Sequence, residues 1–354
     1  AENTTNKGPN FVKLRLPNIE KKHLLCALDS VQYYCIRILH GEEPSMIITI
    51  TLNAALDRTL RIDQPLAVGK LNRAASSHLE PGGKGINVAM ILQNLGVSNR
   101  ALGFLAGFTG DFIEKDLRRR GCRTDFVRLE KGFSRINVKL KGQEGSEING
   151  SGPAVDQAAV QALFEKISTL QKGDILIISG SVPLSLPQDF YERILDLLKG
   201  REIDTVVDAT GEALLKTLRY EPFLIKPNLQ ELEELAERRL FTREEIIAQG
   251  KRLQEMGAKN VLISLAAEGA ILLTAEGEIL FGEAPRGKLV NAVGAGDSMV
   301  GGFVAGWVKT GNYCEALQWG VAAGSASAFC ETLATGEESR RLYDETINII
   351  REEC

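Results

Sequence analysis

The strongest chemical signal in the sequence is a turn of small residues, Asn291-Ala-Val-Gly-Ala-Gly-Asp-Ser-Met299, which runs into an apolar stretch. Gly294, Ala295 and Gly296 permit a tight turn, and the apolar stretch predicts a long helix. Free backbone N–H groups and the positive end of the helix dipole would form an anion site there, suited to a phosphate. Asp297 falls in the first helical turn, where a carboxylate could accept a proton from a hydroxyl that attacks a phosphoryl group. The alternative is that Asp297 only adds a favourable charge to the helix N-terminus.

A second glycine-rich segment, Pro81-Gly-Gly-Lys-Gly-Ile-Asn-Val-Ala89, also precedes an amphipathic helix. Close approach of the backbone, together with one cation, suits a small polyol or a phosphorylated sugar. The alternative is a glycine-rich loop with a solvated lysine.

Two further segments end predicted buried strands. In Leu224-Ile-Lys-Pro-Asn-Leu-Gln-Glu231 a proline stops the strand and Asn228 caps the next helix. Glu231 could complete a capping box or hold the water shell of Mg²⁺. The segment Ser264-Leu-Ala-Ala-Glu-Gly269 is a turn that could pass under nucleotide phosphates.

Composition and missing motifs exclude several classes of protein. The 354 residues carry a formal net charge of −4, which gives no basic surface for nucleic acid or an anionic membrane. No run approaches the roughly 18 apolar residues of a membrane span. The three histidines and the absence of any Cys-x-x-Cys pair among six cysteines disfavour His-dependent hydrolases, zinc sites and a disulfide framework. A reducing, cytoplasmic location is therefore expected.

The first 45 residues differ from the rest of the chain. They begin with Ala1-Glu2 and show no clean periodicity, whereas Met46 opens a clear strand, MIITITLN. We expect residues 1–45 to be a leader foreign to the natural protein, and residues 46–354 to form one domain; the alternative is a genuine extension that packs on the surface.

From Met46 onward, apolar strands alternate with amphipathic helices, which predicts parallel βαβ units and a sheet covered on both faces. Strands are predicted at Ile47–Leu52, Arg100–Leu105, Asp174–Ser179, Thr205–Val207, Phe223–Ile225, Val261–Leu265 and Ala270–Thr274. Helices are predicted at Ile86–Leu95, Asp111–Arg120, Gln157–Leu170, Gln188–Leu198, Glu212–Leu218, Leu229–Glu237, Thr242–Met256, Ala295–Lys309 and Tyr313–Phe329. Four pieces break this rhythm and could form a small separate sheet: Arg58–Ile62, Leu71–His78, Phe126–Leu129 and Arg135–Lys141.

These segments, in this order, resemble the PfkB (ribokinase-like) family of sugar kinases. GGKGINVA is similar to the family's N-terminal signature, NAVGAGDSM to its C-terminal one, and KPNLQE to its Lys-Pro-Asn and Asn-x-x-Glu motif. The resemblance implies a three-layer α/β/α sandwich with a mostly parallel central sheet. It also implies a small β-sheet lid formed by about residues 57–80 and 123–150, which often makes the family's dimer; a homodimer through the lid is therefore expected.

The resemblance also implies roles for individual residues. Asp297 resembles the catalytic base, within an anion hole formed by Gly294, Ala295, Gly296 and Asp297. The substrate-binding positions are Asp57, Gly82, Gly83, Lys84, Asn87, Arg135 and Ser181. The positions that contact ATP are Lys226, Asn228, Ser264, Leu265, Ala266, Ala267, Glu268, Gly269 and Gly296. Glu231 resembles the glutamate associated with Mg²⁺.

Within the family, TLNAALD, SRINVKL and VVDATGEAL are most similar to the branch that phosphorylates ketohexose phosphates. The implied reaction is the ATP-dependent conversion of fructose 1-phosphate to fructose 1,6-bisphosphate. The alternatives are tagatose 6-phosphate as the substrate and a non-catalytic sensor of sugar phosphates. A dehydrogenase is disfavoured because no Gly-x-Gly-x-x-Gly motif occurs.

The chain departs from the family pattern at four positions. Ala54 replaces a proline, Ala266 replaces a glycine, and Ala292 stands where threonine or serine is usual. An alanine at 266 is strained if the turn there needs a positive φ. Asn291 stands where ribokinase has an aspartate near its monovalent cation, which leaves activation by potassium open.

Overall fold

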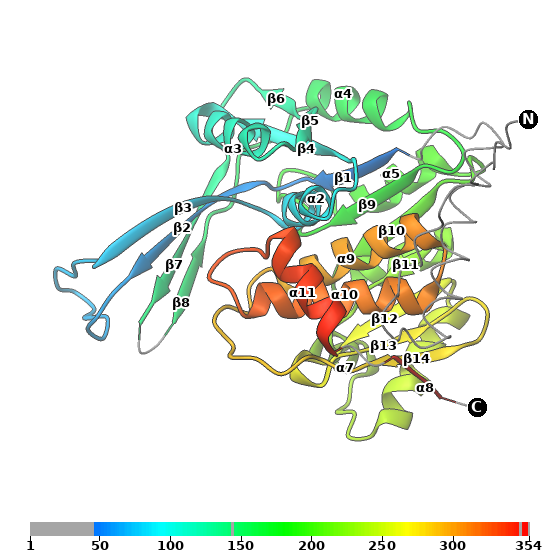
Figure 1. Cartoon of the computed structure of the whole chain (residues 1–354). Helices are drawn as coiled ribbons and strands as arrows, with labels where there is room; N and C mark the ends of the chain where they lie inside the picture. The colour runs from blue at the N-terminus through cyan, green and yellow to red at the C-terminus, as the bar shows by residue number, and fades with distance from the viewer. Residues whose placement is uncertain (1–45, 143–144, 347–348, 353–354) are drawn as a thin grey trace, which may run out of the picture. The chain divides into compact units, whose positions relative to one another are not determined.

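The computed structural model describes residues 46–142, 145–346 and 349–352, all within one compact unit, Glu43–Cys354 (Figure 1). The predicted leader, residues 1–45, lies outside the described residues. The strands are β1 (Ile47–Thr51), β2 (Ala55–Arg61), β3 (Ser76–Gly82), β4 (Arg100–Ala106), β5 (Arg123–Thr124), β6 (Val127–Leu129), β7 (Arg135–Lys141), β8 (Ser146–Asn149), β9 (Ile175–Ser179), β10 (Asp204–Asp208), β11 (Leu224–Ile225), β12 (Asn260–Ser264), β13 (Ala270–Leu273), β14 (Ile279–Gly282) and β15 (Ile349–Glu352). The helices are α2 (Lys84–Asn94), α3 (Gly107–Arg119), α4 (Gln157–Ile167), α5 (Phe190–Leu198), α6 (Gly211–Thr217), α7 (Leu229–Ala236), α8 (Arg243–Glu255), α9 (Ala295–Thr310), α10 (Tyr313–Ala328) and α11 (Gly336–Thr346), with 3₁₀ turns η1 (Leu218–Tyr220) and η2 (Ala266–Glu268).

The central sheet is mostly parallel, as predicted. In the described part of the chain its order is β15-β14-β13-β12-β11-β10-β9-β1-β4-β5, with β6 beside β4. Pairing is parallel from β12 through β9 and β1 to β4, whereas β13, β14 and β15 add antiparallel strands at one edge. Because parallel neighbours place their carboxyl ends at one edge of the sheet, residues at the ends of β1, β9, β10 and β11 come together there.

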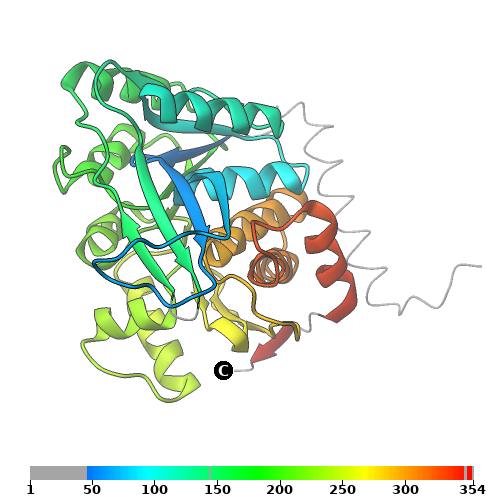
Figure 2. The same cartoon turned by 90° about the vertical axis from the view of Figure 1, so that its left-hand side faces the viewer.

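Helices cover both faces of this sheet, and alternate residues of each strand face opposite layers. In β1, Ile48 and Ile50 face a core that also holds α4, α5, α6 and α8, whereas Ile47 faces a core with α2, α9 and α10. Figure 2 shows α2, α9 and α11 on one side of the sheet and the green helices on the other. The chain therefore has the predicted three layers.

A second, smaller sheet of order β3-β2-β7-β8 extends from the central body and is called the lid below (Figure 1). It consists of two antiparallel pairs joined by the parallel pairing of β2 with β7. Three residues separate β1 from β2, and one residue separates β3 from α2. The lid is thus joined closely to two elements of the central body.

The structure corrects several of the predicted boundaries. Val127–Leu129 forms β6 and pairs with β4 in the central sheet, and β5 does the same, so residues 123–129 are not part of the lid. Residues 71–75 precede β3 and form no strand. The elements β14, β15 and α11 were not predicted. None of the helices in the described part of the chain combines the length and apolar character needed to cross a bilayer.

Candidate active site

The predicted anion-binding turn forms at the start of α9. Gly294 is the N-cap residue with φ 82°, a conformation that glycine adopts without steric cost. The amides in the first turn of a helix have no acceptor within the helix and can bind an anion. The Ala295 amide already donates to the Ala292 carbonyl at 3.3 Å, so an anion would be met mainly by the amides of Gly296 and Asp297. Asp297 is the third residue of α9 and is only 7% exposed. The turn therefore presents backbone donors and one buried carboxylate at the same place.

Asp297 is held by Asn87 from α2, whose side-chain amide donates a 2.7 Å hydrogen bond to Oδ2. Burial raises the pKa of Asp297 to about 6, and the negative charge of Asp208 adds to this effect. The hydrogen bond from Asn87 and the positive charges of Lys84 and Lys226 oppose the increase. Asp297 is therefore mostly ionised at neutral pH, and it binds a proton as the pH falls toward 6.

Asp208 ends β10 with a fully buried carboxylate between two lysines. Lys84 Nζ lies 3.2 Å from Oδ2, and Lys226 Nζ lies 3.5 Å from Oδ1. Burial acts to lower the pKa of Lys84, but the charges of Asp208, Asp297 and Glu231 together outweigh it and raise that pKa. We call Lys84, Asp208, Lys226 and Asp297 the charged cluster.

Asp208 was not among the predicted site residues, although it lies in the quoted VVDATGEAL segment. The signal that could have found it is its position at the carboxyl end of a predicted buried parallel strand, where ligand-binding residues gather.

Among the predicted sugar positions, Asp57 of β2 lies against the glycine loop, residues 82–85. A Cβ atom at Gly82 would lie 2.5 Å from Asp57 Cγ, so only glycine allows this approach. Asn137 Nδ2 donates to Asp57 Oδ1 at 2.8 Å, and Lys139 Nζ lies 2.6 Å from Oδ2. Asn137 and Lys139, both on β7, were not predicted as site residues.

Arg135 begins β7 and reaches the base of the lid. Its Nε donates to the Asn53 carbonyl at 3.1 Å, and Nη1 to the Gly150 carbonyl at 3.5 Å. Burial lowers the pKa of Arg135, while the charge of Asp57 acts in the opposite direction. Ser181 is exposed in the loop that follows β9, directly after Gly180, where a Cβ atom would contact Lys84 Cβ at 3.6 Å.

The predicted nucleotide positions follow β11 and β12. Asn228 and Glu231 form the predicted capping box, because Asn228 Oδ1 accepts from the Glu231 amide and Glu231 Oε2 accepts from the Asn228 amide. Asn228 is bridged to Ser264, so the two segments lie side by side. Ala267 and Glu268 are exposed in η2, and Gly269 follows this turn.

Ala266 does adopt a positive φ, 51°, so the expected strain is present. Asn291, at the position tied to the monovalent cation in ribokinase, donates from Nδ2 to the Glu331 carbonyl at 3.0 Å. Ala54 is buried and Ala292 is exposed.

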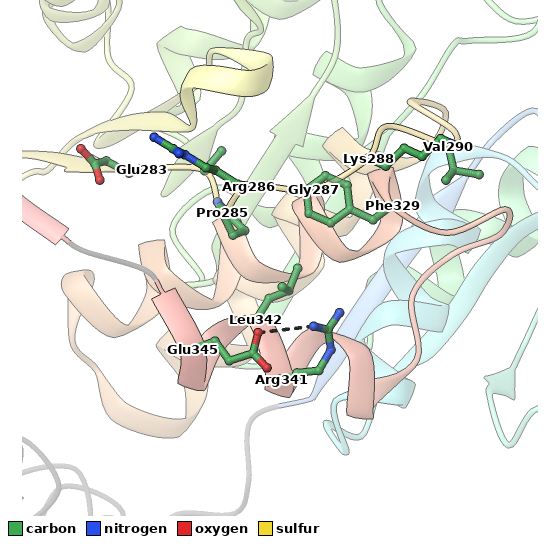
Figure 3. A pocket seen from close by; sticks show the side chains of 11 residues that line it. Glu283, Pro285, Arg286, Gly287, Lys288, Val290, Phe329, Arg341, Leu342 and Glu345 are labelled. Atoms are coloured by element: carbon green, nitrogen blue, oxygen red, sulfur yellow. Dashed lines mark hydrogen bonds and ion pairs between the residues drawn. The ribbon is translucent and has the colours of Figure 1, made fainter.

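A cavity of about 730 Å³ lies between α11 and the loop of residues 283–290 (Figure 3). Phe329 and Leu342 line it together with charged residues of both signs, including Arg286 and the ion pair between Arg341 and Glu345. The loop borders the predicted nucleotide turn, since a Cβ atom at Gly269 would lie 2.7 Å from the Ala284 amide nitrogen. None of the predicted site residues lines this cavity.

Comparisons with known proteins bear on the family and the fold. The family described as pfkB family carbohydrate kinase matches residues 49–340. The chain is 45% identical over 300 residues to 1-phosphofructokinase of Bacillus subtilis, covering 85% of this chain and 98% of that protein. It is 39% identical over 289 residues to D-tagatose-1-phosphate kinase of Bacillus licheniformis, covering 81% and 94%.

Among solved structures, phosphofructokinase-2 of Escherichia coli in complex with substrates and products superposes with a TM-score of 0.80 at 29% identity, covering 84% of this chain and 98% of that one. A family match over most of the chain, together with the layered fold and the lid, leads to one conclusion: this chain belongs to the pfkB family of carbohydrate kinases.

Proposed function

We propose that this kinase transfers the γ-phosphoryl group of ATP to the C6 hydroxyl of fructose 1-phosphate, which yields fructose 1,6-bisphosphate and ADP. The observation that carries the proposal is the buried carboxylate of Asp297 at the free N-terminus of α9, next to the two lysines of the charged cluster. The similarity to the B. subtilis 1-phosphofructokinase supports the choice of sugar.

Asp297 is the proposed general base. The C6 hydroxyl gives its proton to Asp297 while its oxygen forms a bond to the γ-phosphorus, and the bond from that phosphorus to the bridging oxygen of ADP breaks. The amides of Gly294, Ala295, Gly296 and Asp297 are proposed to stabilise the charge that develops on the phosphoryl oxygens. Their fixed positions at a helix N-terminus support this role, because fixed donors need no reorganisation during the reaction.

The nucleotide is proposed to bind along Lys226, Asn228, residues 264–269 and Gly296. The adjacency of Asn228 to Ser264, and of the Lys226 ammonium to Gly296, supports one continuous surface. A Cβ atom at Gly296 would lie 3.3 Å from Lys226 Nζ, which places that cation beside the helix start.

Mg²⁺ is proposed to be held near Glu231. The residues fit this ion because Glu231 uses only Oε2 in the capping box, which leaves Oε1 available to a metal-bound water. Across the described residues, no group of three or more His, Cys, Asp or Glu could hold a metal. This agrees with an ion that takes most of its ligands from phosphates and water. When bound, the ion would offset negative charge on the transferred phosphate.

The sugar is proposed to bind between the lid and the glycine loop, with Asp57, Gly82, Gly83, Lys84 and Asn87 around its hydroxyls and Arg135 and Ser181 toward its phosphate. The position of Asp57 against Gly82 supports this placement.

We also propose a homodimer through the lid. Leu79, Arg58, Val138 and Ile148 form one row across the four strands, on the face opposite Asp57. Leu79 is 40% exposed and Ile148 is 64% exposed, and exposed apolar side chains on a sheet mark an interaction surface. Phosphofructokinase-2 of E. coli has a solved structure of a tetrameric inhibited form. Sedimentation of the wild type and of an Ile148→Glu variant tests the dimer. If the variant has the same dimeric mass as the wild type, this face of the lid is not the dimer interface.

The expected location is the cytoplasm, where ATP is available and thiols such as buried Cys122 stay reduced.

The test of the proposed activity is a coupled assay of ADP release with a panel of sugars: fructose 1-phosphate, fructose 6-phosphate, tagatose 1-phosphate, tagatose 6-phosphate and fructose. We expect the highest kcat/KM with fructose 1-phosphate. The similarity to D-tagatose-1-phosphate kinase makes a tagatose phosphate the second candidate, with the phosphate on C1 in that relative. No ADP release with any sugar would instead identify a non-catalytic sensor.

A further inference from the structure

The lid carries a row of polar side chains beyond the predicted sugar site. Arg135, Asn137 and Lys139 alternate along β7, so their side chains project from one face of the lid. They lie opposite Ala55, Asp57 and Thr59 of β2 in parallel register. Arg135 stands at the base of this row and Lys139 at its outer end, with Asp57 between them.

Two of these side chains have unused hydrogen-bonding capacity in a nearly buried position. Lys139 is 16% exposed, and within the described residues its ammonium pairs with Asp57 alone, although an ammonium carries three donors. Asn137 is 6% exposed, and its Oδ1 atom has no hydrogen-bond partner in the part of the chain that the structure describes. The orientation of this amide is fixed because its Nδ2 must face the Asp57 carboxylate. A buried acceptor without a partner is unfavourable in the empty protein, and a ligand hydroxyl would relieve it.

Charge decides what kind of ligand fits. A sugar phosphate carries close to two negative charges, and it would be repelled by the Asp57 carboxylate that is needed for its hydroxyls. Lys139 offsets the charge of Asp57 at 2.6 Å and retains donors for phosphate oxygens. An unphosphorylated ketose does not need a cation at this position, because it adds no charge beside Asp57.

We propose that Lys139 is a specificity-determining residue that binds the phosphate of the acceptor sugar, while Asn137 Oδ1 accepts a hydrogen bond from one of the sugar's hydroxyls. This rests on the proposed function, since it assumes that a ketohexose phosphate is the acceptor. Lys139 then selects phosphorylated over unphosphorylated ketoses.

The experiment compares kcat and KM of the full chain with fructose 1-phosphate and with fructose, for the wild type, Lys139→Met and Lys139→Arg. Lys139→Met should raise KM for fructose 1-phosphate by roughly 10- to 100-fold and leave kcat within about threefold, the pattern of lost uniform binding. Its kcat/KM for fructose should stay within about threefold of the wild type. Lys139→Arg keeps the charge and should restore most of the preference for the phosphorylated sugar.

Lys141→Met is the matched control, because Lys141 is the next residue outward on the same face of β7 and lies opposite Arg61, one pair beyond the pairing of Lys139 with Thr59. It should change neither substrate's KM by more than about twofold. An equal fall for both substrates in Lys139→Met, with a native melting curve, would show that Lys139 only supports the lid and would overturn the proposal. An equal effect of Lys141→Met would also overturn it. Failure of the proposed function is seen separately, as a wild type that does not phosphorylate any ketohexose phosphate.

Discussion

At the scale of single residues, Asp297 carries the most direct prediction. Asp297→Asn preserves size and an oxygen for the Asn87 amide but removes the carboxylate that we propose accepts the proton. We expect kcat to fall by roughly 10²- to 10⁴-fold, the usual contribution of general base catalysis, with KM for the sugar largely kept. Steady-state kinetics measure this. Asp189→Asn, an exposed carboxylate at the N-cap of α5, is the control and should leave kcat unchanged. Near-native turnover of Asp297→Asn would disprove the assignment.

The charged cluster predicts a pH dependence. In its proposed role as a base, Asp297 can act only when it is ionised, so kcat/KM should rise with pH through its pKa of about 6 and level off above it. In Asp208→Asn, the nearby negative charge that raises this pKa is removed, and Lys84 and Lys226 lose the carboxylate that offsets them. Both changes favour ionised Asp297, so the acid limb should move to lower pH. A pH–rate profile that stays in place, or moves to higher pH, would contradict this account.

How far single residues could be predicted depended on their surroundings in the chain. Asp297, Lys84, Asn87 and Lys226 stand in glycine- or proline-marked segments, and the structure brings all four together. Asp208 ends an ordinary apolar strand with no such marker. Lys139 belongs to a polar–apolar alternation that is also typical of a strand with one solvated face. Only its ion pair with Asp57, which the structure shows, distinguishes a site residue from a solvated lysine.

At the scale of elements, the turn η2 contains a testable strain. Ala266 has φ 51°, where an L-residue with a Cβ atom is disfavoured by about 1–2 kcal/mol relative to the right-handed region. Ala266→Gly should therefore stabilise the protein by up to about 1 kcal/mol, less the extra entropy of glycine in the unfolded chain. Urea unfolding measures this change.

The neighbouring Ala267→Gly provides the matched control, because Ala267 lies in the same turn without a positive φ. It should destabilise the protein by roughly 0.5–1 kcal/mol, since glycine adds flexibility there without relieving strain. If both variants destabilise equally, the left-handed conformation of Ala266 is not a source of strain.

Elements with a long periodic pattern of apolar residues were predicted from the sequence. Elements whose position depends on the strands or helices they pack against were not. β14 is four residues long and buried throughout, so it shows no alternation. Helix α11, GEESRRLYDET, is mostly charged, and its burial rests on a few side chains such as Leu342. Val127–Leu129 reads as a strand in the sequence, but whether it joins the lid or pairs with β4 depends on the tertiary structure.

At the scale of the whole molecule, residues 1–45 precede both the family match and every predicted site residue. A chain that begins at Met46 should therefore keep the kcat/KM of the full chain, within about twofold, and a similar melting temperature. Parallel assays of the two proteins measure this. A folded but inactive 46–354 chain would show that the first 45 residues belong to the enzyme.

The charged cluster also links nucleotide binding to proton binding. Its two lysines and two aspartates come from four segments that are distant in sequence, and one of the aspartates has a pKa of about 6. At the proposed nucleotide site, a triphosphate without Mg²⁺ would add negative charge beside Asp297 and favour its protonated form, so Asp297 should take up protons on binding near pH 6. The heat of binding measured by titration calorimetry should then vary with the ionisation enthalpy of the buffer. The triphosphate's own terminal phosphate also titrates at about pH 6, so the contribution of Asp297 is the difference in this variation between the wild type and Asp297→Asn. That difference measures the charged cluster without any turnover.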